Sequence, residues 1–146
     1  MLKNRIFLDS SILITALLSS RGGSFYILTQ LKNKFHFQIN NYVLEEIFKV
    51  LDKKFFSQKE LKNHLFLLMG LAKVEILPNP VQSSLKKLSR FINKEDAPIL
   101  ASVFLNSDYL LTLDKDFLNE KIRNFAKENN VLIFTPKEFI GFLRIK

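Results

Sequence analysis

The sequence predicts a single α/β domain, with a mostly parallel central β-sheet flanked by helices on both faces. Short apolar runs typical of buried strands alternate along the chain with stretches of helical periodicity, which is the pattern of parallel βαβ crossovers. The 146 residues are enough for one domain with a sizeable core and too few for two. The apolar fraction of 47% and the charged fraction of 25% are those of a globular protein. We therefore treat residues 1–146 as one domain.

The predicted strands are short and end at clear boundaries. The first, RIFL, runs directly into an aspartate and two serines, and VEIL is closed by the sequence Pro-Asn-Pro. The run DYLLTLD also ends on an acid. The predicted strands cover residues 5–8, 35–39, 74–77, 108–114 and 131–134.

Between these strands, apolar residues recur at the spacing of an amphipathic helix. We expect Ser10 or Ser11 to cap the first helix, and Asn40 to cap the third. Ser57 and Glu60 have the spacing of a capping box at the start of the fourth. The basic stretch 81–94 is interpreted as a connection. The predicted helices cover residues 12–18, 25–32, 40–55, 57–71 and 94–106, and a last one starts at Pro136.

Charge and composition narrow the range of possible functions. The chain has 22 Lys and Arg against 14 Asp and Glu, a net charge of +8, which favours polyanionic partners and above all nucleic acid. The absence of cysteine excludes disulfides, thiolate nucleophiles and zinc ribbons. His36 and His64 lie far apart in unlike contexts, so we expect packed or surface histidines rather than metal ligands.

The apolar N-terminal stretch does not predict a signal peptide. Asp9 and two serines interrupt it, and no small-x-small cleavage pattern follows. Residues 12–18 are too few to span a bilayer. We expect a cytoplasmic protein without a membrane partner.

Acidic residues follow two of the predicted strands. Asp9 comes directly after RIFL, and Asp114 follows YLLTL with Asp116 two residues later. In an open parallel sheet, ligands bind beyond the carboxyl ends of the strands, so these side chains are candidates for one site. Asp9 alone would also suit an ordinary helix N-cap, but a single cap does not explain acids at two strand ends.

Two helices add candidates to this group. Asp96 falls on the helical stripe that carries Leu100 and Val103, and therefore points toward the core. Glu46 lies closer than Glu45 to the centre of its apolar stripe and borders the buried face. The alternatives are a capping or dipole-favoured acid for Asp96 and a surface acid for Glu46.

Carboxylates that converge on one cleft repel each other and raise their own pKa values, and a hard divalent cation removes this conflict. Mg²⁺ or Mn²⁺ prefers carboxylate oxygen, and it supports phosphodiester hydrolysis by lowering the pKa of a bound water. Surrounding basic residues would then hold the polyanion. The candidates for RNA contact are Lys86, Lys87 and Arg90, followed by Arg21, Lys53 and Lys115.

Four segments resemble, in order, the successive motifs of PIN-domain ribonucleases. They are FLDSSILITALLS, NYVLEEIFKVL, KEDAPILASVFLNSDYLLTLDKDF and VLIFTPKEFI, and they span nearly the whole chain. The resemblance implies a Mg²⁺- or Mn²⁺-dependent endoribonuclease. Matched by position, it assigns metal ligands to Asp9, Glu46, Asp96 and Asp114, an accessory acid to Asp116, and a site-arranging hydroxyl to Ser10.

Two positions depart from the family pattern. Ser11 stands where the family generally has an asparagine that orients the first aspartate, and Pro98 is unusual just after Asp96. Many compact members are toxins of bacterial toxin–antitoxin pairs, which implies an antitoxin partner and a homodimer.

Two alternative functions belong to other classes of protein. The first is a catalytically silent PIN-like module that binds RNA or a protein. The second is a phosphate-handling protein, such as a haloacid-dehalogenase-like phosphatase or a receiver domain. The phosphatase would need a second aspartate where Ser11 stands, and the receiver domain would need paired acids at the end of the first strand.

Overall fold

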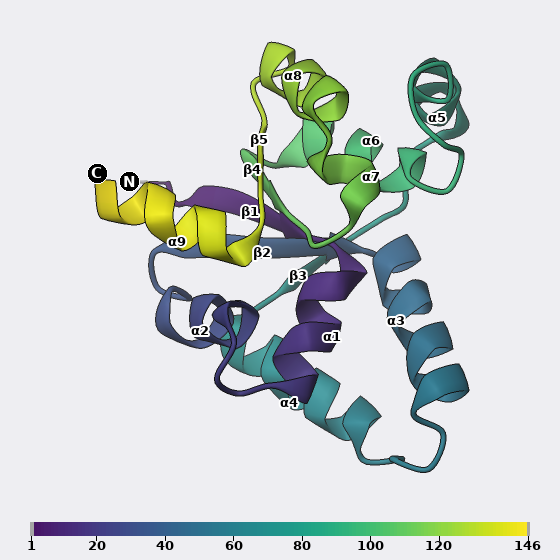
Figure 1. The fold of residues 1–146 in the computed structure, drawn as a ribbon. Coiled ribbons are helices and arrows are strands. Elements are labelled where there is room, and N and C mark those ends of the chain that lie inside the picture. The colour runs from purple at the N-terminus through teal and green to yellow at the C-terminus, as the bar shows by residue number, and fades with distance from the viewer. Residues whose placement is uncertain (1, 146) are drawn as a thin grey trace.

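The structure, a computed structural model, describes residues 2–145. In this part of the chain the sheet has five strands in the order β3-β2-β1-β4-β5, and every neighbouring pair is parallel (Figure 1). The predicted fold class is therefore confirmed, with a sheet that is wholly rather than mostly parallel. The strands are β1 (Asn4–Leu8), β2 (Phe35–Asn40), β3 (Glu75–Leu77), β4 (Tyr109–Leu111) and β5 (Leu132–Phe134).

Helices cover both faces of the sheet. Figure 1 shows α1, α2 and α4 on one face and α5, α6 and α8 on the other. Within residues 2–145 no single helix is both long and apolar enough to cross a membrane; α1 and α2 together would be, but they meet at a bend of 96°. The helices are α1 (Ser10–Leu18), α2 (Gly23–Gln30), α3 (Asn41–Lys54), α4 (Leu61–Ala72), α5 (Gln82–Leu88), α6 (Ala97–Asn106), α7 (Lys115–Leu118), α8 (Glu120–Glu128) and α9 (Pro136–Ile145).

The core lies on both sides of the central strand. Ile6, Phe7 and Leu8 of β1 are fully buried, as expected for a parallel strand covered on both faces. On the side of α9, Phe139 makes an edge-to-face contact with Tyr109 of β4, with ring centroids 5.5 Å apart. β4 pairs directly with β1 in the sheet, and the carboxyl ends of these two strands carry two of the predicted site acids.

Several predicted boundaries need correction. Asp9, rather than Ser10 or Ser11, is the N-cap of α1, because its carboxylate accepts a hydrogen bond from the Ser10 N–H. The capping box at Ser57 and Glu60 does not form: α4 starts at Leu61 and has no side-chain cap.

The remaining differences concern element lengths. α2 begins at Gly23, inside the predicted turn, and the predicted strand 108–114 forms β-ladder pairs only over Tyr109–Leu111. The helix predicted over 94–106 starts at Ala97, and the basic connection contains α5. Helices α7 and α8 were not predicted.

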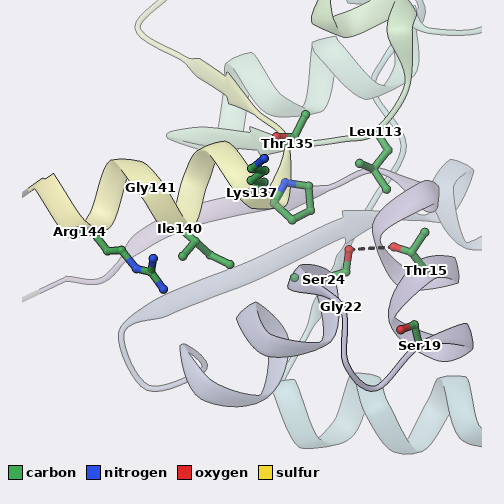
Figure 2. Close-up of a pocket in the computed structure, with 12 residues that line it drawn as sticks. Thr15, Ser19, Gly22, Ser24, Leu113, Thr135, Lys137, Ile140, Gly141 and Arg144 are labelled. Carbon is green, nitrogen blue, oxygen red and sulfur yellow. Dashed lines mark hydrogen bonds between the residues drawn. The ribbon is translucent and has the colours of Figure 1, made fainter.

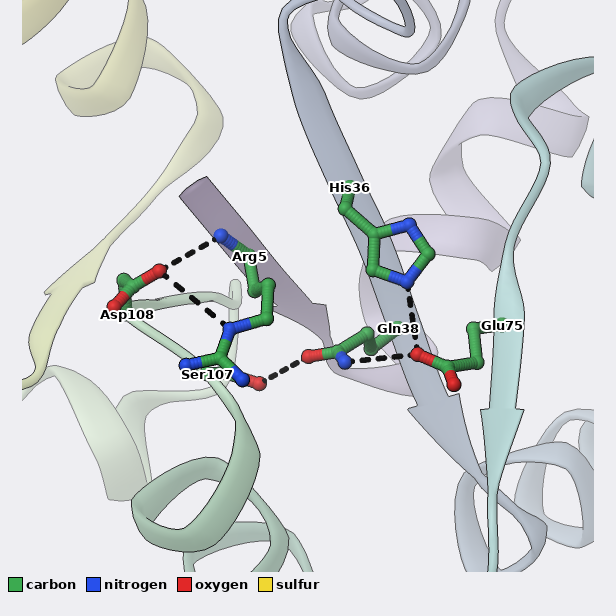
Figure 3. Close-up of polar contacts among 6 residues, drawn as sticks. All are labelled: Arg5, His36, Gln38, Glu75, Ser107 and Asp108. Atoms are coloured by element: carbon green, nitrogen blue, oxygen red, sulfur yellow. Dashed lines mark hydrogen bonds and ion pairs between the residues drawn. The ribbon is translucent and has the colours of Figure 1, made fainter. Parts of the chain in front are cut away.

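The amino-terminal edge of the sheet carries a self-paired polar network (Figure 3). The buried Gln38 accepts a hydrogen bond from the Ser107 hydroxyl at 2.7 Å and donates one to Glu75 at 2.9 Å. His36 also pairs with Glu75, at 2.8 Å, as expected of a surface histidine. Hydrogen bonds from Gln38 and His36 lower the pKa of Glu75. The polar groups at this edge thus satisfy one another.

Candidate metal centre

The five predicted acids all lie at the opposite, carboxyl-terminal edge of the sheet. α1 and α3 begin at this edge in Figure 1, and α6 begins against α3. Asp9 directly follows β1, Asp96 and Asp114 are the N-cap residues of α6 and α7, Asp116 lies in α7, and Glu46 lies in the second turn of α3. Segments distant in sequence therefore bring these carboxylates together.

Asp9 is the most deeply enclosed of the five, with 3% of its surface exposed. Its Oδ1 accepts a 2.7 Å hydrogen bond from the Ser10 N–H. Its Oδ2 accepts bonds from the Thr112 hydroxyl at 2.7 Å and the Ser11 hydroxyl at 3.1 Å. Burial raises the pKa of Asp9, and these bonds partly oppose the rise. The residue is thus both a helix cap and a member of the acidic group.

Ser11 and Thr112 tie the ends of β1 and β4 together around Asp9. The Ser11 hydroxyl also accepts a bond from the Leu113 N–H at 3.1 Å, and the Thr112 hydroxyl accepts one from the Asp114 N–H at 3.0 Å. Ser11 therefore makes an orienting contact with the first aspartate. Thr112 was missed in the sequence, where the only signal is a hydroxyl residue between an apolar strand and an acid.

Asp96, Asp114 and Asp116 form the tightest cluster. One carboxylate oxygen from each lies within 4.8 Å of the others. Asp96 is 8% exposed, makes no capping hydrogen bond, and leaves its buried Oδ2 without a partner. Burial, followed by the charges of Asp114 and Asp116, raises the pKa of Asp96 to about 7.

Glu46 faces the same space from α3. It is partly buried while Glu45 is exposed, as the helical spacing predicts. Its buried Oε1 has no hydrogen-bond partner. Burial, followed by the charges of Asp9 and Asp96, raises the pKa of Glu46 to about 7.

Asn40 holds the two helices that carry Glu46 and Asp96. It is fully buried, and its Oδ1 caps α3 by accepting the Val43 N–H at 2.9 Å. Its amide nitrogen donates to the Pro98 carbonyl at 3.1 Å and to the Ser102 hydroxyl at 2.8 Å, both in α6. Pro98 itself fits in the first turn of α6, where a missing N–H breaks no helical bond.

The donor set suits a hard divalent cation. All the converging ligand atoms are carboxylate oxygens, which Mg²⁺ and Mn²⁺ prefer. Two buried oxygens lack any partner, and like charges together with burial disfavour ionisation of their carboxylates. A bound cation would satisfy both oxygens and favour the ionised forms.

A groove of about 800 Å³ opens beside this edge, between the α1–α2 turn and α9 (Figure 2). Leu113, whose N–H bonds to Ser11, lines it next to the acids. Lys137 and Arg144 lie on its α9 wall, and the hydroxyls of Thr15 and Ser24 hydrogen-bond to each other on the other wall at 2.8 Å. At this volume the groove can hold a ligand much larger than a single ion.

The basic residues predicted for RNA contact are all exposed but are not all near the acids. Lys115 lies between Asp114 and Asp116 in sequence, whereas Lys53 lies in the last turn of α3, away from the acidic edge. Arg21 lies in the α1–α2 turn, Lys86 and Lys87 lie on α5, and Arg90 follows α5.

Solved structures of two proteins resemble this chain. PAE2754 from Pyrobaculum aerophilum superposes with a TM-score of 0.66 at 16% identity, over 99% of this chain and 100% of that one. VapBC2 from Rickettsia felis, solved bound to a DNA fragment from their promoter, gives a TM-score of 0.64 at 17% identity, over 90% of this chain and 98% of that one. No protein-family model and no curated protein matches the sequence. At these identities the likeness concerns the fold.

Proposed function

Starting from a PIN-domain fold like that of VapC proteins, we propose that this chain is a metal-dependent endoribonuclease of the cytoplasm. One observation carries the proposal: two buried carboxylate oxygens without partners, Glu46 Oε1 and Asp96 Oδ2, lie in a group of like-charged acids. Such an arrangement is unfavourable without a cation.

Four residues would hold Mg²⁺ or Mn²⁺, with Asp116 in support: Asp9, Glu46, Asp96 and Asp114. When bound, the cation would neutralise the carboxylates, lower the pKa of a water and stabilise charge on the leaving oxygen of a phosphodiester. Ser10, Ser11 and Thr112 hold the Asp9 carboxylate in one orientation.

The substrate we propose is single-stranded or looped RNA. A net charge of +8 attracts a polyanion to a protein whose candidate site is itself acidic, and Lys121 lines the hollow that Asp96 and Asp116 share. Lys115, placed between two of the acids in α7, is the nearest basic residue to them along the chain.

By analogy with the VapBC2 complex, we further propose that the chain is the toxin of a toxin–antitoxin pair and forms a homodimer. An antitoxin segment with a basic residue would complement the acidic edge. The competing proposal is a catalytically silent binding module, which is suggested by Ser11 in place of the usual asparagine. The Ser11 hydroxyl nevertheless donates a hydrogen bond that orients Asp9. Calorimetry with Mn²⁺ separates the two, since a silent module would bind the ion poorly.

The decisive experiment is cleavage of a mixed-sequence RNA by the purified protein, with Mn²⁺ and with EDTA. We expect cleavage only with the metal, and its loss in Asp9→Asn and Glu46→Gln. Glu45→Gln is the matched control, because Glu45 is one residue away on α3 but exposed. Cleavage that persisted in EDTA, or no cleavage by folded protein free of an inhibitor, would contradict the proposed function.

A further inference from the structure

Phe91, between α5 and α6, is a large aromatic residue left in solvent beside the acidic edge. It is 54% exposed. One side of its ring stacks on Phe125 of α8, with centroids 5.1 Å apart and an interplanar angle of 29°. Phe125 is held in turn by an edge-to-face contact with Phe104 of α6 at 5.6 Å. The exposed ring therefore has a fixed support.

Phe91 lines two neighbouring hollows, one with the acidic residues and one with a lysine of α5. Asp96 and Asp116 line one hollow of about 200 Å³ together with Phe91 and Lys121. Phe91 also lines a second hollow of about 280 Å³, with Lys87 of α5. A ligand that reached from the acids toward α5 would pass over this ring.

The charges around Phe91 indicate the chemistry of that ligand. Lys87, Arg90 and Lys121 are exposed, and Arg90 directly precedes Phe91 in sequence. Single-stranded nucleic acid is bound by aromatic rings on which bases stack, set among cations that contact the backbone. Lysine is depleted in protein–protein interfaces, so these surroundings favour RNA over a protein partner.

We propose that Phe91 is a stacking platform for one base of the RNA strand, next to the phosphate that reaches the acids. Lys87 and Lys121 contact phosphates on either side of that base. This inference rests on the proposed RNA substrate, and it assigns Phe91 a role in binding and positioning rather than in the chemistry of cleavage.

The test measures binding of fluorescent single-stranded RNA by anisotropy, in EDTA so that the strand stays intact. Loss of one stacked base is worth about 1–3 kcal/mol, so Phe91→Ala should weaken binding roughly 5- to 150-fold. Phe91→Trp should restore it. Phe66→Ala is the matched control, because Phe66 is also an exposed phenylalanine, 52% exposed, but lies on α4 at the opposite face.

A second readout separates stacking from a merely structural role. Phe91→Ala should leave the dependence of affinity on salt unchanged, whereas Lys87→Ala should reduce the slope by about 0.7 for its lost phosphate contact. Removing single bases from the strand should weaken binding to the wild-type protein at one position only, and should have no further effect on Phe91→Ala.

Three results would overturn the proposal: no binding of single-stranded RNA, equal affinity of Phe91→Ala and wild type, or no rescue by Phe91→Trp in a folded protein. Altered self-association in Phe91→Ala with unchanged RNA affinity would assign the surface to protein contact instead. RNA binding that depends on Phe91 in a protein that cleaves nothing would uphold this inference while the proposed nuclease function failed.

Discussion

Asp96→Asn should stabilise the metal-free protein near neutral pH while abolishing its response to metal. The pKa of Asp96 is raised from 3.8 to about 7 in the folded state. Since the folded pKa lies above the unfolded one, Asp96 has no unfavourable effect on folding below about pH 4, where both states are protonated. As the pH rises toward 7, the unfolded state ionises first and the folded state loses relative stability.

The size of the effect follows from the shift. Each pKa unit corresponds to about 1.4 kcal/mol, so a shift of roughly three units gives at most about 4 kcal/mol near pH 7. Asparagine removes the charge, and its amide only partly replaces the hydrogen bond that the protonated Asp96 shares with Asp116. We therefore expect a net gain of about 1–3 kcal/mol, or roughly 3–9 °C in Tm for a chain of this size.

Thermal unfolding followed by circular dichroism, in EDTA from about pH 4 to about pH 8, measures this gain. The difference between Asp96→Asn and wild type should vanish toward the acidic end. Millimolar Mn²⁺ should then raise the Tm of wild type and leave Asp96→Asn nearly unchanged. Glu95→Gln, at an exposed neighbouring acid, is the control. An Asp96→Asn protein less stable than wild type near pH 7.5 in EDTA would refute the reasoning.

Three further predictions concern the residues around the acids. Thr112→Val removes the 2.7 Å bond to Asp9, so the pKa of Asp9 should rise further and the acidic limb of the pH–cleavage profile should move to higher pH; an unmoved limb would contradict this role. Ser11→Ala should lower Mn²⁺ affinity measured by calorimetry, because alanine cannot donate the hydrogen bond that orients Asp9. Ser11→Asn should retain the affinity, because the asparagine amide can donate that bond. Asn40→Leu and Gln38→Leu each remove a buried amide of β2 and leave its hydrogen-bond partners unpaired, so each should destabilise the fold by about 1–3 kcal/mol in urea unfolding. Only Asn40→Leu should also reduce metal affinity, because Gln38 lies at the far edge of the sheet; equal losses would be evidence against the role of Asn40.

The sheet and the place of the acids were predictable because they depend on local patterns. Apolar runs bounded by turn residues predict strands, and parallel strands put Asp9 and Asp114 at one edge. Helical spacing was enough to choose Glu46 over Glu45. These inferences need only the residue order and the geometry of regular elements.

Other features depend on competition or on distant partners. Ser10 and Asp9 can both cap α1, and the Asp9 carboxylate takes that place. Thr112, directly after β4, also holds this carboxylate. Asn40 was predictable as a cap, but its bonds to Pro98 and Ser102 join segments about sixty residues apart. Helix α8 does carry a sequence signal, since Asn119 caps it ahead of the apolar Ile122 and Ala126.

The strand order has a consequence for synthesis on the ribosome. β1 emerges first but lies in the middle of the sheet, and its neighbour β4 comes from residues 109–111. The Thr112 hydroxyl that holds Asp9, and the acids at 114 and 116, emerge only afterwards. A nascent chain that has left the exit tunnel only as far as Asp96 thus carries Asp9, Glu46 and Asp96 but no assembled acidic edge. For an enzyme that would cut RNA, the fold itself delays activity until the segment through Asp116 has left the exit tunnel.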